Sequence, residues 1–415
     1  MSTTLFTNIG CLVQVGRGPT SVLRGGAMAE LPTLDQAWLL VRDGRFVDYG
    51  SGPLPVLSDD DTETVDLHGQ WVFPSWVDSH THLVFAASRE GEWVDRLRGL
   101  SYAEIAAKGG GILNSARRLQ DASEEELLRG ALARLREIRR LGTGALEVKS
   151  GYGLTLEAEL KMLRVVRRLR EESGVDIRAT FLGAHALPLE YRDKREDYLR
   201  LVTEEMLPRV AEAKLADYVD VFCEKGFFTL DETIAIVEAG ARYGLRAKVH
   251  VNQFNSLGAV RACVERQAVS VDHLEVFSEE DIAALSGSTT IATVLPSAPF
   301  FLNDPYPDIR RLLAADVAVA LATDYNPGST PSGRMALVLS LACLKCGMLP
   351  AEAINAATLN GAAALEWSEQ YGSIDRGKWA TFFTTPALPS VDYLPYAFGS
   401  NLVRRVFHRG TEVLE

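Results

Sequence analysis

The central part of the chain repeats one pattern, in which a short apolar run ends in polar or glycine residues and a helical stretch separates most runs. Eight such runs occur, and they are WVFPSWVDSH, TGALEVKSGYG, DIRATFLGAHAL, DYVDVFCEKG, LRAKVHVNQF, AVSVDHLEVF, TTIATVLPSAP and DVAVALATDYNPG. Continuous runs of Val, Ala, Ile and Leu are typical of strands that are buried on both faces. Eight strand–helix units over roughly 300 residues predict an α/β fold of the (β/α)8 barrel type.

The main competing fold is a doubly wound parallel sheet. Such a sheet usually carries a glycine-rich phosphate-binding turn directly after its first strand. The first strand expected here ends in His80-Thr81-His82 instead. This ending favours the barrel.

Both ends of the chain have the pattern of antiparallel β structure. WLLVRDGRFVDYG holds two strand-like runs around Asp43-Gly44, and NLVRRVFHRGTEV holds a similar pair around Arg409-Gly410. These dipeptides are typical of tight hairpin turns. We therefore expect a composite β-sandwich domain from residues 1–72 and 372–415, and a barrel domain from residues 73–371.

Composition limits the classes of partner. The chain has 415 residues, is 47% hydrophobic and carries a net charge of -12, which is ordinary for a globular protein and argues against a nucleic-acid partner. No signal peptide and no membrane span is expected. The five scattered cysteines favour a reduced, cytoplasmic location. Cys343 and Cys346 have the spacing of a zinc half-site, but they lie in an apolar stretch without a second pair, so we expect core thiols.

Five of the seven histidines, and one aspartate, fall at the ends of expected strands. They are His80, His82, His185, His250, His273 and Asp324. In an α/β barrel these strand ends meet on the face that carries the active site. Unrelated core histidines are the alternative, but six such residues would rarely meet on one face by chance.

A metal site explains the spacing of these residues. Residues i and i+2 of a strand point to the same side, so His80 and His82 can bind one cation. His250 and Asp324 supply further ligands from other strands. Three imidazoles and a carboxylate suit zinc or iron and do not suit Ca²⁺ or Mg²⁺. Such an ion makes water a nucleophile at neutral pH.

Longer motifs support a resemblance to a known family. VDSHTHLVF, together with the later strand-end histidines and aspartate, resembles the amidohydrolase superfamily. A more specific resemblance, to the imidazolonepropionase family, covers nearly the whole chain and rests on DSHTHLVFAASREGEWVDRLRGLSYAEIAAKGGGI, EVKSGYGL, FLGAHALP, KVHVNQFNSLG, SVDHLE and LATDYNPGS. It implies hydrolysis of the ring amide C–N bond of 4-imidazolone-5-propanoate to N-formimidoyl-L-glutamate, the third step of histidine degradation, with one divalent metal ion per subunit.

The resemblance also implies roles for single residues. Metal-bound hydroxide attacks the ring carbonyl, Asp324 carries the proton to the leaving nitrogen, and His273 hydrogen-bonds the water or the oxyanion without binding the metal. Arg89 resembles the family's clamp for the substrate carboxylate, because a guanidinium matches a carboxylate with two hydrogen bonds. The other substrate-binding residues implied are Tyr102, Tyr152, His185, Gln253, Asn326, Gly328 and Ser329.

Three features depart from the pattern or leave alternatives open. Gln253 stands where one form of the family has Glu, and an amide cannot act as a general base at neutral pH, so we assign it to substrate binding. Some amidohydrolases carry a carbamylated lysine that bridges two metal ions. The resemblance implies a single ion, so we expect Lys149 to be an ordinary structural or ion-paired lysine. The segment Gly109–Gly111 is either a flexible lid or a plain helix-capping loop.

Two other functions compete with this hydrolase. One is a related amidohydrolase or deaminase that acts on another cyclic amide or a nucleobase, and a neutral base would give Arg89 and Tyr152 no carboxylate to hold. The other is a metal-free scaffold with the same fold, which the intact ligand set of His80, His82, His250 and Asp324 disfavours. The partners expected are a small anionic substrate and a second copy of the chain in a homodimer.

Overall fold

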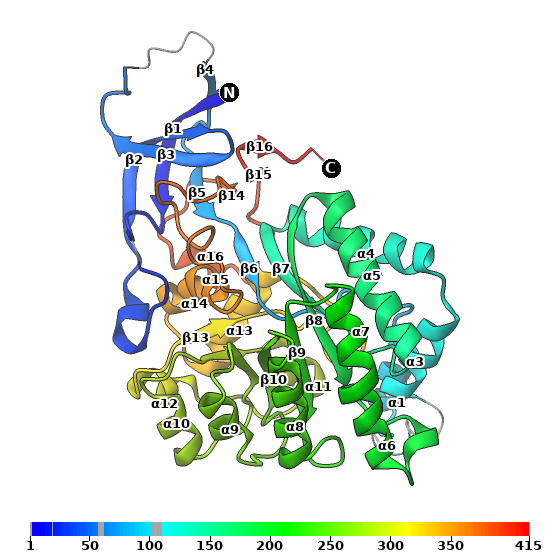
Figure 1. Cartoon of the computed structure of the whole chain (residues 1–415). Coiled ribbons are helices and arrows are strands. Elements are labelled where there is room, and N and C mark those ends of the chain that lie inside the picture. The colour runs from blue at the N-terminus through cyan, green and yellow to red at the C-terminus, as the bar shows by residue number, and fades with distance from the viewer. Residues whose placement is uncertain (1, 19, 57–61, 101–103, 105–109, 415) are drawn as a thin grey trace.

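A parallel barrel forms the centre of the molecule (Figure 1). The computed structural model describes the chain except residues 1, 19, 57–61, 101–103, 105–109 and 415. Eight strands follow one another around the barrel in chain order, each parallel to its neighbour. They are β6 (Trp76–Asp78), β7 (Thr143–Lys149), β8 (Asp176–Ala184), β9 (Tyr218–Cys223), β10 (Arg246–Val251), β11 (Ser270–His273), β12 (Ile291–Val294) and β13 (Val319–Leu321).

The barrel closes just beyond its first and last strands. Thr81 and Tyr325 form a parallel bridge there. The Asp324 N–H donates to the His80 carbonyl at 3.0 Å, and the His82 N–H donates to the Tyr325 carbonyl at 3.0 Å. The predicted (β/α)8 barrel is confirmed, and three of the four residues that the sequence singled out as metal ligands, His80, His82 and Asp324, lie at its seam.

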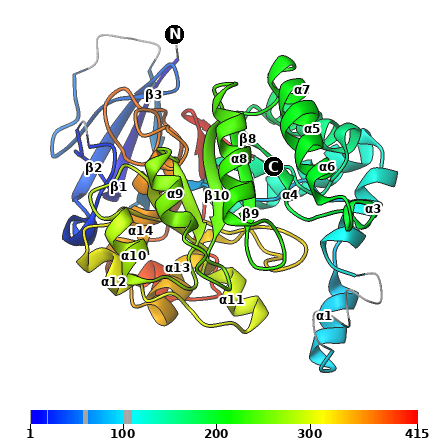
Figure 2. The same cartoon turned by 60° about the horizontal axis from the view of Figure 1, so that its bottom comes forward.

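Helices surround the barrel (Figures 1 and 2). Some of the longer ones begin at capping boxes, as at Ser123 with Glu126 and at Thr229 with Glu232, which satisfy free N–H groups of the first turn. The α-helices are α1 (Glu90–Leu97), α3 (Ile112–Asp121), α4 (Glu124–Arg140), α5 (Leu156–Ser173), α6 (Arg195–Arg200), α7 (Leu207–Glu212), α8 (Leu230–Ala241), α9 (Ala259–Glu265), α10 (Glu279–Leu285), α11 (Ser297–Leu302), α12 (Ile309–Ala314), α13 (Met335–Cys346), α14 (Pro350–Ala357), α15 (Leu359–Ala363) and α16 (Tyr393–Tyr396). Short η segments cover Gly25–Ala29, Leu189–Tyr191 and Leu201–Met206.

A second, mixed sheet is built from both ends of the chain (Figure 1). Its hydrogen-bonded order is β16-β15-β14-β5-β1-β2-β3, with β4 paired to β1. Both hairpin turns lie where the sequence predicts them, with positive φ at Asp43-Gly44 and at Arg409-Gly410. The strands are β1 (Thr3–Val13), β2 (Thr33–Arg42), β3 (Arg45–Ser51), β4 (Thr62–Asp66), β5 (Trp71–Pro74), β14 (Phe382–Thr385), β15 (Val406–His408) and β16 (Thr411–Glu412).

This second sheet curls over its own core. Phe6 of β1 packs edge-on against Phe382 of β14 and Phe407 of β15, with ring centroids 5.2 and 5.1 Å apart. In a flat sheet β1 and β15 would lie about 14 Å apart, since neighbouring strands are about 4.8 Å apart. The contact therefore shows that the sheet folds on itself, as expected for a small sandwich around a core of aromatic side chains.

The cysteines and helices bear on two further expectations. All five cysteines are free, and Cys343 and Cys346 lie in α13 with Cys346 buried, as expected for packing thiols. Of the helices in the described part of the chain, none combines the length and the apolar character that a membrane span requires.

Candidate metal centre and substrate pocket

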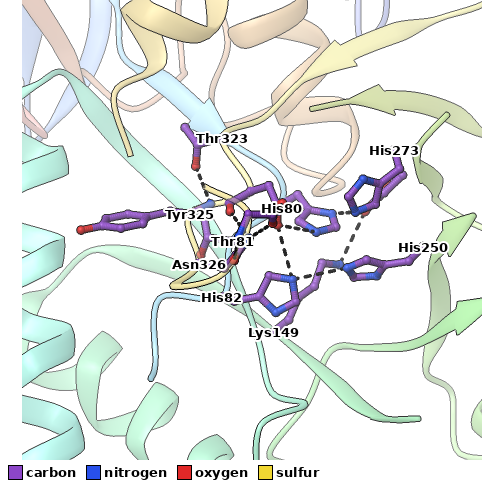
Figure 3. A network of polar contacts seen from close by, with 12 residues as sticks. His80, Thr81, His82, Lys149, His250, His273, Thr323, Tyr325 and Asn326 are labelled. Atoms are coloured by element: carbon purple, nitrogen blue, oxygen red, sulfur yellow. Dashed lines mark hydrogen bonds and ion pairs between the residues drawn. The ribbon is translucent and has the colours of Figure 1, made fainter. Parts of the chain in front are cut away.

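Three histidines and one aspartate converge at the seam of the barrel. His80 and His82 follow β6, His250 lies in β10, and Asp324 follows β13. Oδ1 of Asp324 lies 3.5 Å from Nε2 of His80 and 3.6 Å from Nε2 of His82, and the Nε2 atoms of His82 and His250 are 3.3 Å apart. Figure 3 shows the His80, His82 and His250 rings turned toward one another.

These three separations suit neighbouring ligands of one tetrahedral ion. Two ligands that each bind zinc at about 2.1 Å in tetrahedral geometry lie about 3.4 Å from one another. Nε2 of His80 is buried and finds no hydrogen-bond partner among the described residues. A buried polar atom without a partner is costly, and a cation at this point would remove the cost. The donor set of three imidazoles and a carboxylate therefore fits a divalent metal.

Two buried aspartates determine the tautomers of His80 and His250. Nδ1 of His80 lies 2.7 Å from Oδ2 of Asp272, and Nδ1 of His250 lies 2.8 Å from Oδ2 of Asp220. Because a carboxylate accepts, each Nδ1 carries the hydrogen and each Nε2 presents a lone pair to the centre. Burial, reinforced by neighbouring cationic groups, lowers the pKa of His80 and of His250 well below the usual value. Both imidazoles are therefore neutral and ready to bind a metal.

Asp324 is held in one orientation. Its backbone has φ +56°, which is uncommon for a residue with a side chain. The Ser329 hydroxyl donates to its Oδ2 at 3.0 Å. Burial raises the pKa of Asp324 to about 6, while His273 and Ser329 act in the opposite direction. A carboxyl group that titrates near neutrality can take up and release a proton at working pH.

His273 lies at the same centre with a different electrostatic environment. Its ring nitrogen falls within 4.8 Å of those of His80 and His250. Its Nδ1 lies 3.2 Å from Oε1 of Glu275. Burial disfavours the charged ring, but the carboxylates of Glu275, Asp324 and Asp272 together outweigh burial, and the pKa of His273 is raised. His273 is therefore the imidazole of this group that favours the protonated, hydrogen-donating form.

A layer of buried charges lies beneath the ligands. The Lys149 ammonium is 2.9 Å from Glu147 and 2.9 Å from Asp220, and it is 3.5 Å from Asp272. His80, Glu147 and Asp272 are close enough together to resemble a second metal site. Lys149 already pairs with both carboxylates of that group, so a cation of the protein compensates their charge. The expectation that Lys149 is ion-paired is confirmed.

A cavity of about 470 Å³ opens above these candidate metal ligands. That volume suits a small organic substrate. It is lined by His82, Arg89, Glu92, Trp93, Arg96, Ile112, Tyr152, His185, Phe222, Phe227, His250, Gln253, Phe254, His273, Leu302, Asp304, Asp324, Asn326, Gly328 and Ser329. The cavity thus brings together every residue expected at the site except two. His80 is fully buried beneath it, and Tyr102 lies outside the described residues.

Arg89 reaches the cavity already paired. Its Nη2 lies 2.6 Å from Oε2 of Glu92, which also accepts from the Gly111 N–H at 3.1 Å. Glu92 thereby orients the guanidinium and joins it to the start of α3. On the other side, a Cβ built on Gly328 would lie 3.1 Å from Cζ of Arg89. The guanidinium therefore fits at this position because residue 328 has no side chain.

Tyr152 and His185 form one wall of the cavity. The His185 ring stacks on His82 with centroids 5.4 Å apart, and Tyr152 lies 5.3 Å from His185. Nδ1 of His185 donates to the Gly151 carbonyl at 2.9 Å, so its Nε2 is an acceptor. Burial lowers the pKa of His185 to about 4. This imidazole is neutral and can accept a hydrogen bond from a ring N–H.

Hydrogen bonds from the Asn326 side chain hold the loop that follows Asp324. Its Oδ1 accepts from the N–H groups of Gly328 at 2.7 Å and Ser329 at 2.8 Å. Its Nδ2 donates to the Asp324 carbonyl and to the Ser329 hydroxyl, both at 2.7 Å. The Asn326 amide therefore shapes the loop, and its contact with substrate stays a prediction.

Several cavity residues were missed by the sequence analysis. Glu92 and Arg96 follow Arg89 at helical spacings of three and seven, so a helix expected over this segment could have placed them on the same side. The apolar residues carry no such signal, because a single apolar side chain usually indicates packing, whichever element holds it. They are Trp93, Ile112, Phe222, Phe227, Phe254 and Leu302.

Comparison with known proteins identifies the family to which the chain belongs. Residues 71–413 match the model of the amidohydrolase family. The chain is 52% identical to the imidazolonepropionase of Christiangramia forsetii over 98% of this chain and 99% of that protein. It is 38% identical to the imidazolonepropionase of Alkaliphilus oremlandii over 94% and 93% of the two chains.

Two solved structures with the same fold are distant from this chain in sequence. A triazine hydrolase variant superposes with a TM-score of 0.77 at 16% identity, covering 100% of this chain and 95% of that chain. An adenosine deaminase from Xanthomonas campestris with bound zinc superposes with a TM-score of 0.71 at 15% identity, covering 99% and 92%. At these identities the likeness concerns the fold alone.

Proposed function

The chain belongs to the amidohydrolase family and, within it, to the imidazolonepropionases, and from this premise we propose how its residues carry out the reaction. The enzyme hydrolyses the ring amide C–N bond of 4-imidazolone-5-propanoate to give N-formimidoyl-L-glutamate, a step of histidine degradation. The observation that carries the proposal is that the cavity above the converging ligand set is lined by three of its four members and by Arg89.

The ligands proposed for the metal are His80, His82, His250 and Asp324. Zinc and iron both suit this donor set, and we propose that one ion of either kind binds per subunit. The bound ion would supply Lewis acidity, making water a nucleophile at neutral pH and polarising the ring carbonyl. Metal analysis of the purified protein identifies the ion.

Asp324 and His273 handle protons and charge in this proposal. Asp324 accepts the proton of the attacking water and gives it to the ring nitrogen as the C–N bond breaks, acting as a general base and then as a general acid. His273, whose pKa is raised by Glu275, donates a hydrogen bond to the oxygen on which negative charge develops. Together they serve the two atoms of the amide whose charge changes during hydrolysis.

The other cavity residues hold the substrate. Arg89 binds the propionate, because its planar guanidinium can form two hydrogen bonds with a carboxylate. His185 accepts from a ring N–H through its free Nε2, and Gln253 donates to or accepts from the ring. Tyr152 contributes to the same wall, and Ser329 holds Asp324. A neutral nucleobase has no carboxylate for the Arg89 guanidinium to bind, so a nucleobase deaminase is the weaker alternative.

Turnover of freshly generated 4-imidazolone-5-propanoate tests the function. Loss of the ring's ultraviolet absorbance should follow enzyme addition, and it should stop when a chelator is present. The matched control is a nucleobase such as guanine under the same conditions, for which we expect no reaction. Turnover of the nucleobase without turnover of the imidazolone would contradict the proposal. The homodimer stays a prediction, which light scattering can check.

A further inference from the structure

Among the described residues, Lys149 is the lysine of the buried charge layer that contacts both carboxylates behind the metal ligands. The other lysine of this layer, Lys248, bonds to the Ser270 hydroxyl and the Ala364 carbonyl and lies 3.9 Å from the Glu147 carboxylate, and no ion pair joins it to Asp220 or Asp272 among the described residues. Lys149, Asp220 and Asp272 are all fully buried. Such a charged group is kept inside a protein only where partners compensate it. The burial of Lys149 between these carboxylates therefore suggests that its charge has a function at the site.

The contacts form two parallel chains from one ammonium group to two ligands. One runs from Nζ of Lys149 to Oδ2 of Asp220 at 2.9 Å and on to Nδ1 of His250 at 2.8 Å. The other runs from the same Nζ to Oδ2 of Asp272 at 3.5 Å and on to Nδ1 of His80 at 2.7 Å. In both, the carboxylate oxygen that receives the imidazole hydrogen is the one that faces the lysine.

This geometry fixes the direction of both imidazole rings. His80 and His250 lie on different sides of the barrel, in the segment after β6 and in β10. Their Nε2 atoms can meet at one ion only if the two carboxylates behind them are held at a fixed separation. Two buried carboxylates repel one another, and a cation between them removes the repulsion. Lys149 lies where that cation is needed.

We propose that Lys149 is a positioning residue of the metal centre, which acts on His80 through Asp272 and on His250 through Asp220. This inference rests on the proposed function only in taking these histidines as metal ligands. It assigns Lys149 no contact with substrate and no part in proton transfer. Groups that orient metal ligands in this way typically change metal affinity by 10- to 100-fold when they are removed.

The test measures metal affinity without substrate. Chelator-treated wild type and Lys149→Met are titrated with Zn²⁺ against a chromophoric chelator, and the Co²⁺ forms are compared by visible absorption, which reports ligand geometry. We expect Lys149→Met to bind Zn²⁺ about 10- to 100-fold more weakly and to show an altered Co²⁺ spectrum. Circular dichroism checks that the variant is folded.

Lys378→Met is the matched control. Lys378 is also buried, and its ammonium donates to the Tyr371 carbonyl and the Ser373 hydroxyl, away from the metal ligands. We expect this variant to be less stable than wild type while its Zn²⁺ affinity and Co²⁺ spectrum stay unchanged. A loss of affinity equal to that of Lys149→Met would overturn the inference, because any missing buried lysine would then have the same effect.

Two further results decide the inference. A folded Lys149→Met variant with the Zn²⁺ affinity and Co²⁺ spectrum of wild type would overturn it. If that variant does not fold, Asp272→Asn and Asp220→Asn remove one charge from each chain at constant volume, and wild-type affinity in both would equally overturn it. Because none of these measurements uses substrate, a failure of imidazolone turnover in wild type would count against the proposed function and leave this inference standing.

Discussion

Gly328 is the position where one methyl group should disable the carboxylate clamp without disturbing the fold. A Cβ there would collide with Nη1 of Arg89 and lie 3.1 Å from its Cζ. The glycine has no left-handed φ, so alanine can adopt its backbone. The obstructing atoms end a flexible side chain, which can turn aside at little cost in the free energy of unfolding. We therefore expect Gly328→Ala to fold normally with a displaced Arg89.

The expected size of the effect follows from the bonds that Arg89 would lose. A hydrogen bond to a charged group contributes about 1.5–3 kcal/mol. Losing about 3 kcal/mol of substrate binding corresponds to roughly a 100-fold fall in kcat/KM, since each 1.4 kcal/mol is about tenfold. Arg89→Ala should lose at least as much. Initial rates of ring-absorbance loss over a range of substrate concentrations measure the ratio.

Gly91→Ala is the control for this prediction. Gly91 lies in α1, two residues from Arg89 in sequence, and a Cβ on it would meet nothing within 4 Å. Its kcat/KM should match that of wild type. The reasoning is refuted if Gly328→Ala is folded by thermal melting and retains wild-type kcat/KM, because the guanidinium could then bind the carboxylate from another position.

The remaining predictions concern Asp324 and the metal. Asp324→Asn should keep the fold and lower kcat by about a thousandfold or more, since general acid–base catalysis contributes about 10²–10⁴-fold. A folded variant with substantial residual kcat would show that Asp324 is not the proton carrier. Asp324 must be ionised to accept a proton, and burial raises its pKa to about 6 when no metal is bound. We therefore expect kcat/KM to fall as the pH drops below about 6, or below a lower pH where the bound cation lowers this pKa. A pH–rate profile in which activity rises toward acid would contradict this. Chelator treatment should abolish turnover, and it should lower Tm because a bound ion stabilises the folded state. Zn²⁺ or Fe²⁺, but not Ca²⁺, should restore both. A chelated enzyme with full turnover would exclude a role for the metal.

The sequence predicts the positions of the ligands better than their surroundings. His80 and His82 could be placed on one side of a strand end, and Asp324 at the end of another, because strand periodicity and barrel topology determine which residues share a face. The pairing of Arg89 with Glu92 could not be predicted in the same way, since it depends on side-chain rotamers in a loop and a short helix. The hydrogen bonds that the Asn326 side chain forms within its own loop could not be predicted either.

Lys149 illustrates the same limit inside the barrel. The sequence places it in a strand and suggests an ion pair, but its partners Asp220 and Asp272 come from two other strands. Which carboxylates meet an ammonium in a barrel interior depends on the stagger of the strands, and one sequence does not reveal that stagger.

Three of the four proposed metal ligands lie at the barrel seam, and this position would link the enzyme's chemistry to its biosynthesis. His80 and Asp324 belong to the segments that follow the first and the last barrel strands, and the hydrogen bond that joins these segments is also the bond that brings the two ligands together. A nascent chain that has not yet extended past β13 holds only part of the ligand set. Such a chain has no complete site in which to trap an ion, so full metal binding must wait until the ring of strands has closed.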